Sequence, residues 1–212
     1  MKYGELPKVL DEINVECLEM MFYQYLPIKM IGESKPEVEQ RLSFLKDIIG
    51  CVCCHFVAEY GLDKYIESYC YLTVKHQYQN KEKTFNRQGY HSDGFLTDDI
   101  NYIWSDKSPT IFNFSDFKLT LDDKVSLSEM EEQAMPFNEK TFPNKTLLRL
   151  NQFNIHKVNE NQDEGMRTFI KISFSKDKYD LIGNSHNYEL DYNWQMKERS
   201  KERNIPQSVN LK

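Results

Sequence analysis

A run of short β-type segments begins near residue 66 and decides the fold class. Aromatic and β-branched residues fill these segments, and polar turns separate them. The expected strands span residues 69–74, 99–104, 109–114, 147–158 and 167–174, with a further candidate at 117–121. Because helices come first and strands then follow one another, the sequence predicts an α+β, mainly β chain, folded as a β-sandwich or jelly roll.

Two helices are expected before the strands. Residues 7–30 carry apolar side chains at a spacing that suits one face of a helix, and a longer apolar stripe runs from Val38 to Val57. Pro36 can occupy the first turn of the second helix, and Gly61 can end it. We expect a single domain over 1–212, made of a helical buttress (1–65), a jelly-roll core (66–178) and a polar C-terminal extension (179–212).

Composition narrows the classes of function. The formal net charge of −6 argues against a broad nucleic-acid-binding face, because neutralising phosphates needs clustered Lys and Arg. No run of 18 apolar residues is present, so no membrane span is expected. Residues 1–7 lack the apolar core of a signal peptide, and we therefore expect a cytoplasmic protein.

The five cysteines are expected to be reduced thiols, since their number is odd and no signal peptide is evident. Cys51, Cys53, Cys54 and His55 look at first like a metal cluster. They fall in the expected helix, however, and no second cysteine pair exists to close a tetrahedral site. Buried free thiols are the favoured interpretation.

The chemistry of the chain concentrates in Gly89–Phe95, which reads Gly-Tyr-His-Ser-Asp-Gly-Phe. His91 and Asp93 are two residues apart, so on a strand both side chains leave the same face. His156, on the expected strand 147–158, can add a second imidazole. Two histidines and one carboxylate with open positions are the ligand set of a non-haem Fe(II) oxygenase. The sequence therefore predicts a metal site at His91, Asp93 and His156.

These residues, followed by Arg167, resemble the pattern of the Fe(II)- and 2-oxoglutarate-dependent dioxygenases. That pattern is His-x-Asp/Glu, then a distal His, then Arg or Lys shortly afterwards, and the resemblance covers about residues 69–175. It implies a double-stranded β-helix (jelly roll) buttressed by the N-terminal helices. It also implies Fe(II) as the metal and 2-oxoglutarate as the co-substrate.

The resemblance assigns a role to each of these groups. The keto acid end of 2-oxoglutarate would bind the iron, and Arg167 would pair with the distal carboxylate through its planar fork of donors. In many members a Ser or Thr lies two positions after the basic residue, whereas this chain has Phe169 there. A hydroxyl partner for the co-substrate is therefore expected elsewhere, with Tyr102, Thr110 and Thr168 as candidates.

Two other functions stay open at the level of sequence. A cupin-like metal dioxygenase without 2-oxoglutarate would keep the three ligands and give Arg167 no role. A non-catalytic jelly-roll binding protein would make the triad coincidental. For an oxygenase we expect a small-molecule substrate under a lid at 122–144 that carries a short helix at 126–134, with a protein side chain or a nucleobase as alternatives.

Overall fold

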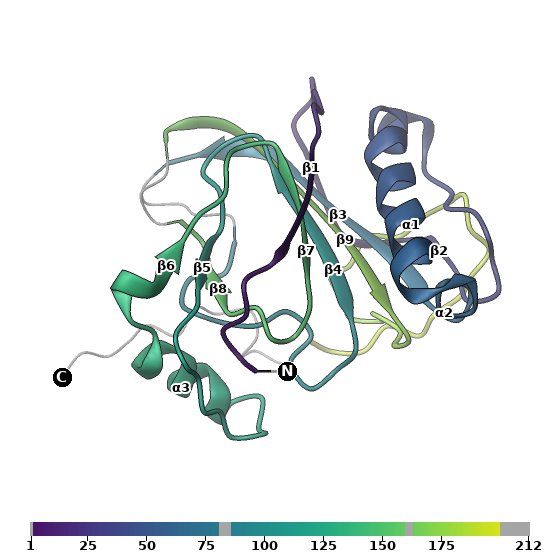
Figure 1. The fold of residues 1–212 in the computed structure, drawn as a ribbon. Coiled ribbons are helices and arrows are strands. Elements are labelled where there is room, and N and C mark those ends of the chain that lie inside the picture. Colours follow the sequence, from purple (N-terminus) through teal and green to yellow (C-terminus); the bar gives the residue numbers. More distant parts are fainter. Residues whose placement is uncertain (1, 81–85, 160–162, 200–212) are drawn as a thin grey trace.

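The structure is a computed structural model that describes residues 2–80, 86–159 and 163–199. The described chain is mainly β, with antiparallel sheets and few helices, as the sequence predicts (Figure 1). The strands are β1 (Lys8–Glu12), β2 (Met21–Lys29), β3 (Tyr69–Gln79), β4 (Ile100–Ser105), β5 (Ile111–Asn113), β6 (Glu139–Lys140), β7 (Thr146–Leu150), β8 (His156–Lys157) and β9 (Gly165–Ser175). The helices are α1 (Lys46–Tyr60), α2 (Leu62–Ile66) and α3 (Val125–Gln133), with short 3-10 helices η1 (Gln40–Leu45) and η2 (Pro136–Asn138).

The strands form two sheets. The larger sheet has the order β1-β7-β4-β9-β3-β2, and the smaller has the order β6-β5-β8. His91 extends the smaller sheet through an isolated antiparallel bridge to His156 in β8. An apolar cluster joins the two sheets, with Phe112 from the smaller sheet and Phe169 and Leu148 among the residues of the larger one.

The other face of the larger sheet is covered by α1 (Figure 1). Alternation along β9 sends Ile170, Ile172 and Phe174 into this face, where Phe56 of α1 stacks on Phe174 with ring centroids 4.0 Å apart. Gly61 follows the helix with φ at +88°, a conformation that glycine adopts easily. The predicted apolar stripe of the second helix therefore packs against the sheet as expected.

The N-terminal segment differs from the expectation. Residues 7–30 form two strands and no helix, because β1 pairs with β7 and β2 pairs with β3 at the two edges of the larger sheet. Pro27 is tolerated because β2 is an edge strand. The helical buttress predicted over 1–65 is therefore wrong for 7–30. Helical structure in that region begins at Gln40, not at the predicted Pro36.

Two predicted strands also differ. The strand expected at 147–158 is interrupted, because β7 ends at Leu150 and a turn separates it from β8 at His156. The backbone N–H of Asn154 donates to the carbonyl of Asn151 within this turn, at 3.1 Å. The candidate at 117–121 is not a strand. By contrast, α3 falls where the short lid helix was predicted.

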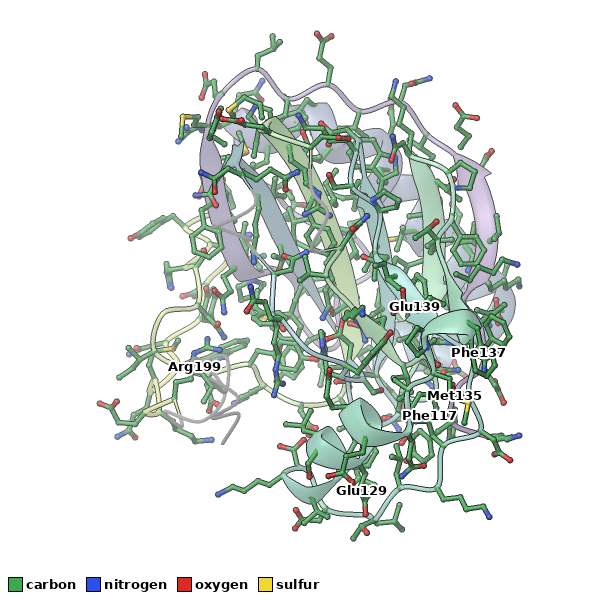
Figure 2. All side chains as sticks on the ribbon, turned by 90° about the vertical axis from the view of Figure 1, so that its left-hand side faces the viewer. Phe117, Glu129, Met135, Phe137, Glu139 and Arg199 are labelled. Carbon is green, nitrogen blue, oxygen red and sulfur yellow. The ribbon has the colours of Figure 1, made fainter. Side chains whose placement is uncertain are left out.

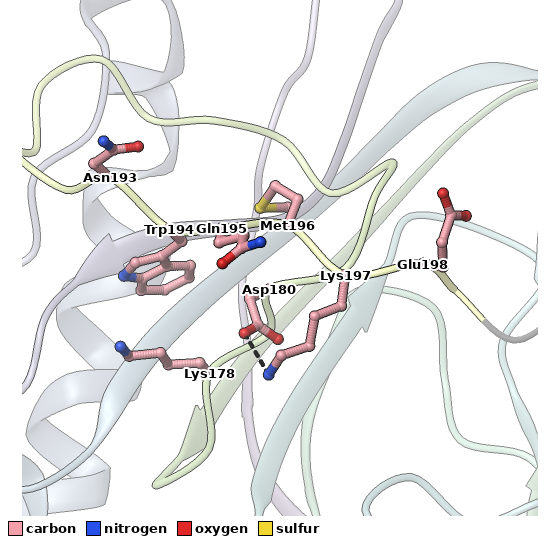
Figure 3. Close-up of a pocket in the computed structure, with 8 residues that line it drawn as sticks. All are labelled: Lys178, Asp180, Asn193, Trp194, Gln195, Met196, Lys197 and Glu198. Carbon is pink, nitrogen blue, oxygen red and sulfur yellow. Dashed lines mark ion pairs between the residues drawn. The ribbon is translucent and has the colours of Figure 1, made fainter.

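The described part of the C-terminal extension packs on the larger sheet. Tyr179 stacks on Tyr71 of β3 at 4.2 Å, and the buried Asn187 donates to the carbonyls of Pro27 and Glu37. A surface hollow of about 540 Å³ lies along this segment, where Lys197 pairs with Asp180 (Figure 3). Most of the charged run at 197–203 lies outside the described residues. No helix in the described ranges has the length and apolar character needed to cross a membrane.

Candidate metal centre

The backbone places His91 and His156 directly opposite each other. Each N–H donates to the carbonyl of the other residue at 2.9 Å, and the two rings lie 4.5 Å apart. Because cross-strand partners project from the same face, the two imidazoles point the same way. The pairing therefore depends on the short β8, which also holds β5 on its other side.

The turn between β7 and β8 fixes the loop that carries Asp93. The hydroxyl of Ser92 donates to the carbonyl of Gln152 at 2.5 Å. The side-chain amide of Gln152 donates to the carbonyl of Thr97 at 2.7 Å and accepts from the N–H of Leu96 at 3.2 Å. Gln152 therefore positions the loop, a role that the sequence pattern did not reveal.

Gly94 allows the chain to turn sharply just after Asp93. Its φ is +72°, and a Cβ at this position would lie 2.8 Å from the hydroxyl oxygen of Thr97 and 2.9 Å from Cβ of Asp99. A side chain here would meet both a strained backbone and a steric clash. The placement of the Asp93 carboxylate therefore depends on glycine at this position.

Hydrogen bonds determine the tautomers of the two histidines. Nδ1 of His91 lies 3.0 Å from the carbonyl of Gly89, and Nδ1 of His156 lies 2.9 Å from the carbonyl of Asn154. A carbonyl oxygen only accepts, so in both rings Nδ1 carries the proton and donates. The Nε2 lone pairs are left for a ligand, the arrangement usual for metal-binding histidines.

His91, Asp93 and His156 fit a divalent metal. One ligand atom from each residue lies within 4.8 Å of the others. Within the described residues this is the one such group of three or more potential ligands, and it does not include the thiols near His55. All five cysteines are free, in agreement with the prediction of reduced thiols. A two-histidine, one-carboxylate donor set suits Fe(II) and leaves positions open.

Burial and neighbouring charges set the pKa values of His91 and Asp93. Desolvation lowers the pKa of His91 to about 3, with a further contribution from His156, so the ring is neutral near pH 7. Burial alone would raise the pKa of Asp93. The ammonium of Lys171 and the two imidazoles outweigh this effect and hold that pKa well below its usual value. The site therefore offers a neutral imidazole at His91 and an ionised carboxylate at Asp93.

Lys171 is a member of the site that the sequence analysis missed. Its Nζ lies 2.7 Å from Oδ2 of Asp93, and its side chain is 9% exposed. Burial would lower the pKa of Lys171, but the Asp93 carboxylate dominates and raises it. The available signal was a single lysine inside the apolar run Phe169–Phe174, in phase with Arg167 along the strand.

Arg167 lies on the same face of β9 as Lys171 and is 3% exposed. Its Nε donates to the carbonyl of Lys107 at 2.9 Å and one terminal nitrogen donates to the carbonyl of Ser108 at 3.1 Å. Among the described residues, no carboxylate forms an ion pair with this guanidinium. Burial lowers the pKa of Arg167 to about 10, an effect that Asp106 partly offsets. A buried guanidinium with donors to spare fits a carboxylate ligand.

Lys75 adds a third cation to this face. It lies opposite Phe169 in the β3–β9 pairing, so its side chain leaves the sheet beside those of Arg167 and Lys171. Desolvation, together with the charges of Arg167 and Lys171, lowers the pKa of Lys75 to about 8. The region between the sheets is therefore strongly cationic around a single carboxylate of the triad.

The three candidate hydroxyl partners are placed differently. The Tyr102 hydroxyl lies 2.9 Å from Nδ1 of His55 on α1, and the Thr168 hydroxyl lies 2.9 Å from Nδ1 of His76. Both side chains leave the sheet on the face opposite Arg167, because they alternate with the inward-facing residues. The structure therefore does not bring Tyr102 or Thr168 to the site. Thr110 is 9% exposed and lies two residues after Ser108, next to the loop that holds Arg167.

The predicted lid contacts the ligand-bearing loop. The N–H of Tyr90 donates to Oε2 of Glu131 on α3 at 3.0 Å, and Tyr90 packs in a cluster with Met130 and Phe117. Figure 2 shows Phe117 close to α3, which carries Glu129. The carboxylate of Glu129 in turn accepts from the N–H and hydroxyl of Thr120. Helix α3 is therefore docked directly beside the loop that carries the candidate ligands His91 and Asp93.

None of the models of known protein families matches the chain, and no curated protein matches it either.

Proposed function

We propose that this protein is an Fe(II)- and 2-oxoglutarate-dependent oxygenase that oxidises a C–H bond of a small molecule. The observation that carries the proposal is the combination of the His91, Asp93 and His156 cluster with a buried Arg167 that lacks a carboxylate partner among the described residues. A metal site alone would fit many metalloenzymes. The additional buried cation points to a carboxylate-bearing co-substrate.

The strand order supports a double-stranded β-helix. From β3 onward the chain alternates between the two sheets. Strands β3, β4, β7 and β9 belong to the larger sheet, whereas His91, β5, β6 and β8 belong to the smaller one. This yields two packed antiparallel sheets of the kind found in jelly rolls. His91 and His156 lie on the smaller sheet, Asp93 lies in the loop that follows His91, and Arg167 lies on the facing strand β9.

Each residue has a defined task in this proposal. Nε2 of His91, Nε2 of His156 and a carboxylate oxygen of Asp93 would hold the metal. Arg167 would bind the distal carboxylate of 2-oxoglutarate with a bidentate pair of N–H donors. When bound, Fe(II) and 2-oxoglutarate supply the oxidation of the substrate by O2, with release of succinate and CO2.

The enclosure of the site favours a small molecule as primary substrate. The side chains of Asp93 and His156 are 22% and 7% exposed, and α3 is docked beside the loop that carries Asp93. A polypeptide would need a longer open groove to reach the same atoms. A panel of small molecules should therefore contain a compound that stimulates succinate formation, whereas stimulation by polypeptides or nucleic acids alone would overturn this assignment.

The role of Arg167 is tested by the 2-oxoglutarate dependence of succinate formation. In Arg167→Met the concentration for half-maximal rate should rise by about tenfold to a hundredfold, since hydrogen bonds to a charged group are lost. Arg41→Met removes a surface pair with Glu19 and should leave this value unchanged. An unchanged requirement in Arg167→Met would instead support a cupin-like metal dioxygenase.

A further inference from the structure

The ion pair between Lys171 and Asp93 places a fixed positive charge against a predicted metal ligand. Nζ of Lys171 lies 2.7 Å from Oδ2 of Asp93, while Nε2 of His156 lies 3.6 Å from the same oxygen. The ammonium and the imidazole thus both approach the same carboxylate oxygen. A divalent cation bound by the triad would share this carboxylate with Lys171.

The surroundings of Lys171 hold it in place. Its ammonium lies 5.4 Å from the ring centre of Tyr25, which itself meets Tyr179 edge-on at 5.0 Å. Tyr25 has φ at +47° and sits where the register of β2 shifts against β3. Its N–H donates to the hydroxyl oxygen of Thr73 at 3.0 Å. A non-glycine residue with positive φ at a bulge is costly, and such bulges re-aim side chains next to functional sites.

Positive charges already lie on the face of the larger sheet that meets the triad. Arg167 and Lys171 share this face; Lys171 is paired with Asp93, and Asp106 partly offsets the effect of burial on Arg167. A divalent cation would add further positive charge to a poorly solvated region, which is unfavourable without a matching anion. A dianion entering with the metal would restore the balance.

We propose that Lys171 couples metal binding to the binding of an anionic co-substrate. In the absence of both, Lys171 neutralises Asp93 and opposes the entry of a divalent cation. When a dicarboxylate binds, it supplies the negative charge that lets the ammonium and the metal share Asp93. This inference rests on the proposed function. By linkage, the metal must strengthen anion binding by the same factor.

Calorimetric titration with Mn²⁺, which resists oxidation, tests the coupling without relying on turnover. Binding is measured with and without 2-oxoglutarate in wild type, Lys171→Met and Lys171→Gln, and circular dichroism confirms that each variant is folded. Without 2-oxoglutarate, both variants should bind Mn²⁺ about tenfold or more tightly than wild type, within the usual range of coupling. With 2-oxoglutarate, the affinities should converge to within about threefold.

Lys197→Met is the matched control, because it removes a lysine–carboxylate pair of 2.8 Å outside the site. It should reproduce wild type in both titrations. If Mn²⁺ alone binds folded Lys171→Met or Lys171→Gln no more tightly than wild type, the coupling role of Lys171 is overturned while the metal centre stands. If no form of the protein binds Mn²⁺ under either condition, the proposed function itself fails.

Discussion

His91 lies at the centre of the site, with Nδ1 donating to Gly89 and its ring beside His156. Its neighbours set two properties of the ring: the bond from Nδ1 to Gly89 leaves Nε2 for a metal ion, and burial lowers the pKa to about 3. An imidazole with this pKa stays unprotonated in mildly acidic solution.

Stability of the metal-free protein should depend on pH through His91. Between pH 6.5 and pH 3 the unfolded chain binds a proton on this ring and the folded protein does not. The free energy of unfolding should therefore fall with decreasing pH, by about 1.4 kcal/mol per pH unit for this group. Urea unfolding at several pH values in the presence of a chelator measures the slope.

The comparison for this slope is His91→Asn, whose side-chain amide can still donate toward Gly89. Its stability should fall less steeply than that of wild type below pH 6.5. Identical slopes in the two proteins would mean that the folded and unfolded states protonate His91 alike, contrary to its placement in the structure.

Among single residues, sequence reasoning found those with a recognisable pattern. His91, Asp93, His156 and Arg167 were proposed together, and the structure places the first three within ligand distance of one another. Lys171 was not found, because its role depends on the contact of its strand with a loop that is distant in sequence. The hydroxyl partners could not be chosen for the same reason: strand alternation turns Tyr102 toward α1.

The loop that carries Asp93 is the element on which the site depends most. It is held by Gln152 on one side and turns at Gly94, where there is no room for a side chain. A change at Gly94 should therefore act on the metal ligands through the backbone. Gly50 provides a contrast, because it is exposed on α1 and a Cβ there would meet nothing within 4 Å.

Alanine substitutions at these two glycines should have opposite effects. Gly94→Ala should destabilise the fold by more than about 1 kcal/mol and weaken Mn²⁺ binding, since the clash displaces the Asp93 loop. Gly50→Ala should stabilise the fold by about 0.5–1 kcal/mol with no change in Mn²⁺ binding, since alanine favours the helix. Thermal unfolding and calorimetry measure both. Retention of wild-type Mn²⁺ affinity in Gly94→Ala would contradict the proposed dependence of the ligand on this turn.

Elements with strong local signals were predicted well. Helix α1, the long strands β3 and β9 and the short helix α3 lie where composition and spacing indicate. The N-terminal strands were not predicted, because their apolar spacing also suits a helix and pairing with β3 and β7 decides between the two structures. In the N-terminal segment, tertiary contacts override the local preference for a helix.

At the scale of the whole molecule, the larger sheet separates two regions with different tasks. Its α1 face buries a continuous apolar core, and its other face carries the cationic residues and meets the smaller sheet, which bears His91 and His156. The apolar core and the candidate site thus lie on opposite sides of one sheet. The arrangement allows the cost of buried charge on one face to be offset by apolar packing on the other.

Truncation of the α1 core should therefore lower stability without changing the site. Phe56 is fully buried and stacks on Phe174, so Phe56→Ala should lower the free energy of unfolding by about 3 kcal/mol or more. The exposed Phe137 is the control, and Phe137→Ala should change stability by no more than about 0.5 kcal/mol. In the folded Phe56→Ala protein, Mn²⁺ affinity should stay within about twofold of wild type. A large loss of affinity would show that the two faces are not independent.

The most direct test of the central proposal is an anaerobic titration of the protein with Fe(II) and 2-oxoglutarate, followed by visible absorption. We expect a weak charge-transfer band that requires both additions and is absent in His91→Ala, with His186→Ala, which changes an exposed histidine outside the site, behaving as wild type. Iron binding without the band would contradict the role of 2-oxoglutarate. No iron binding at all would contradict the metal centre formed by His91, Asp93 and His156.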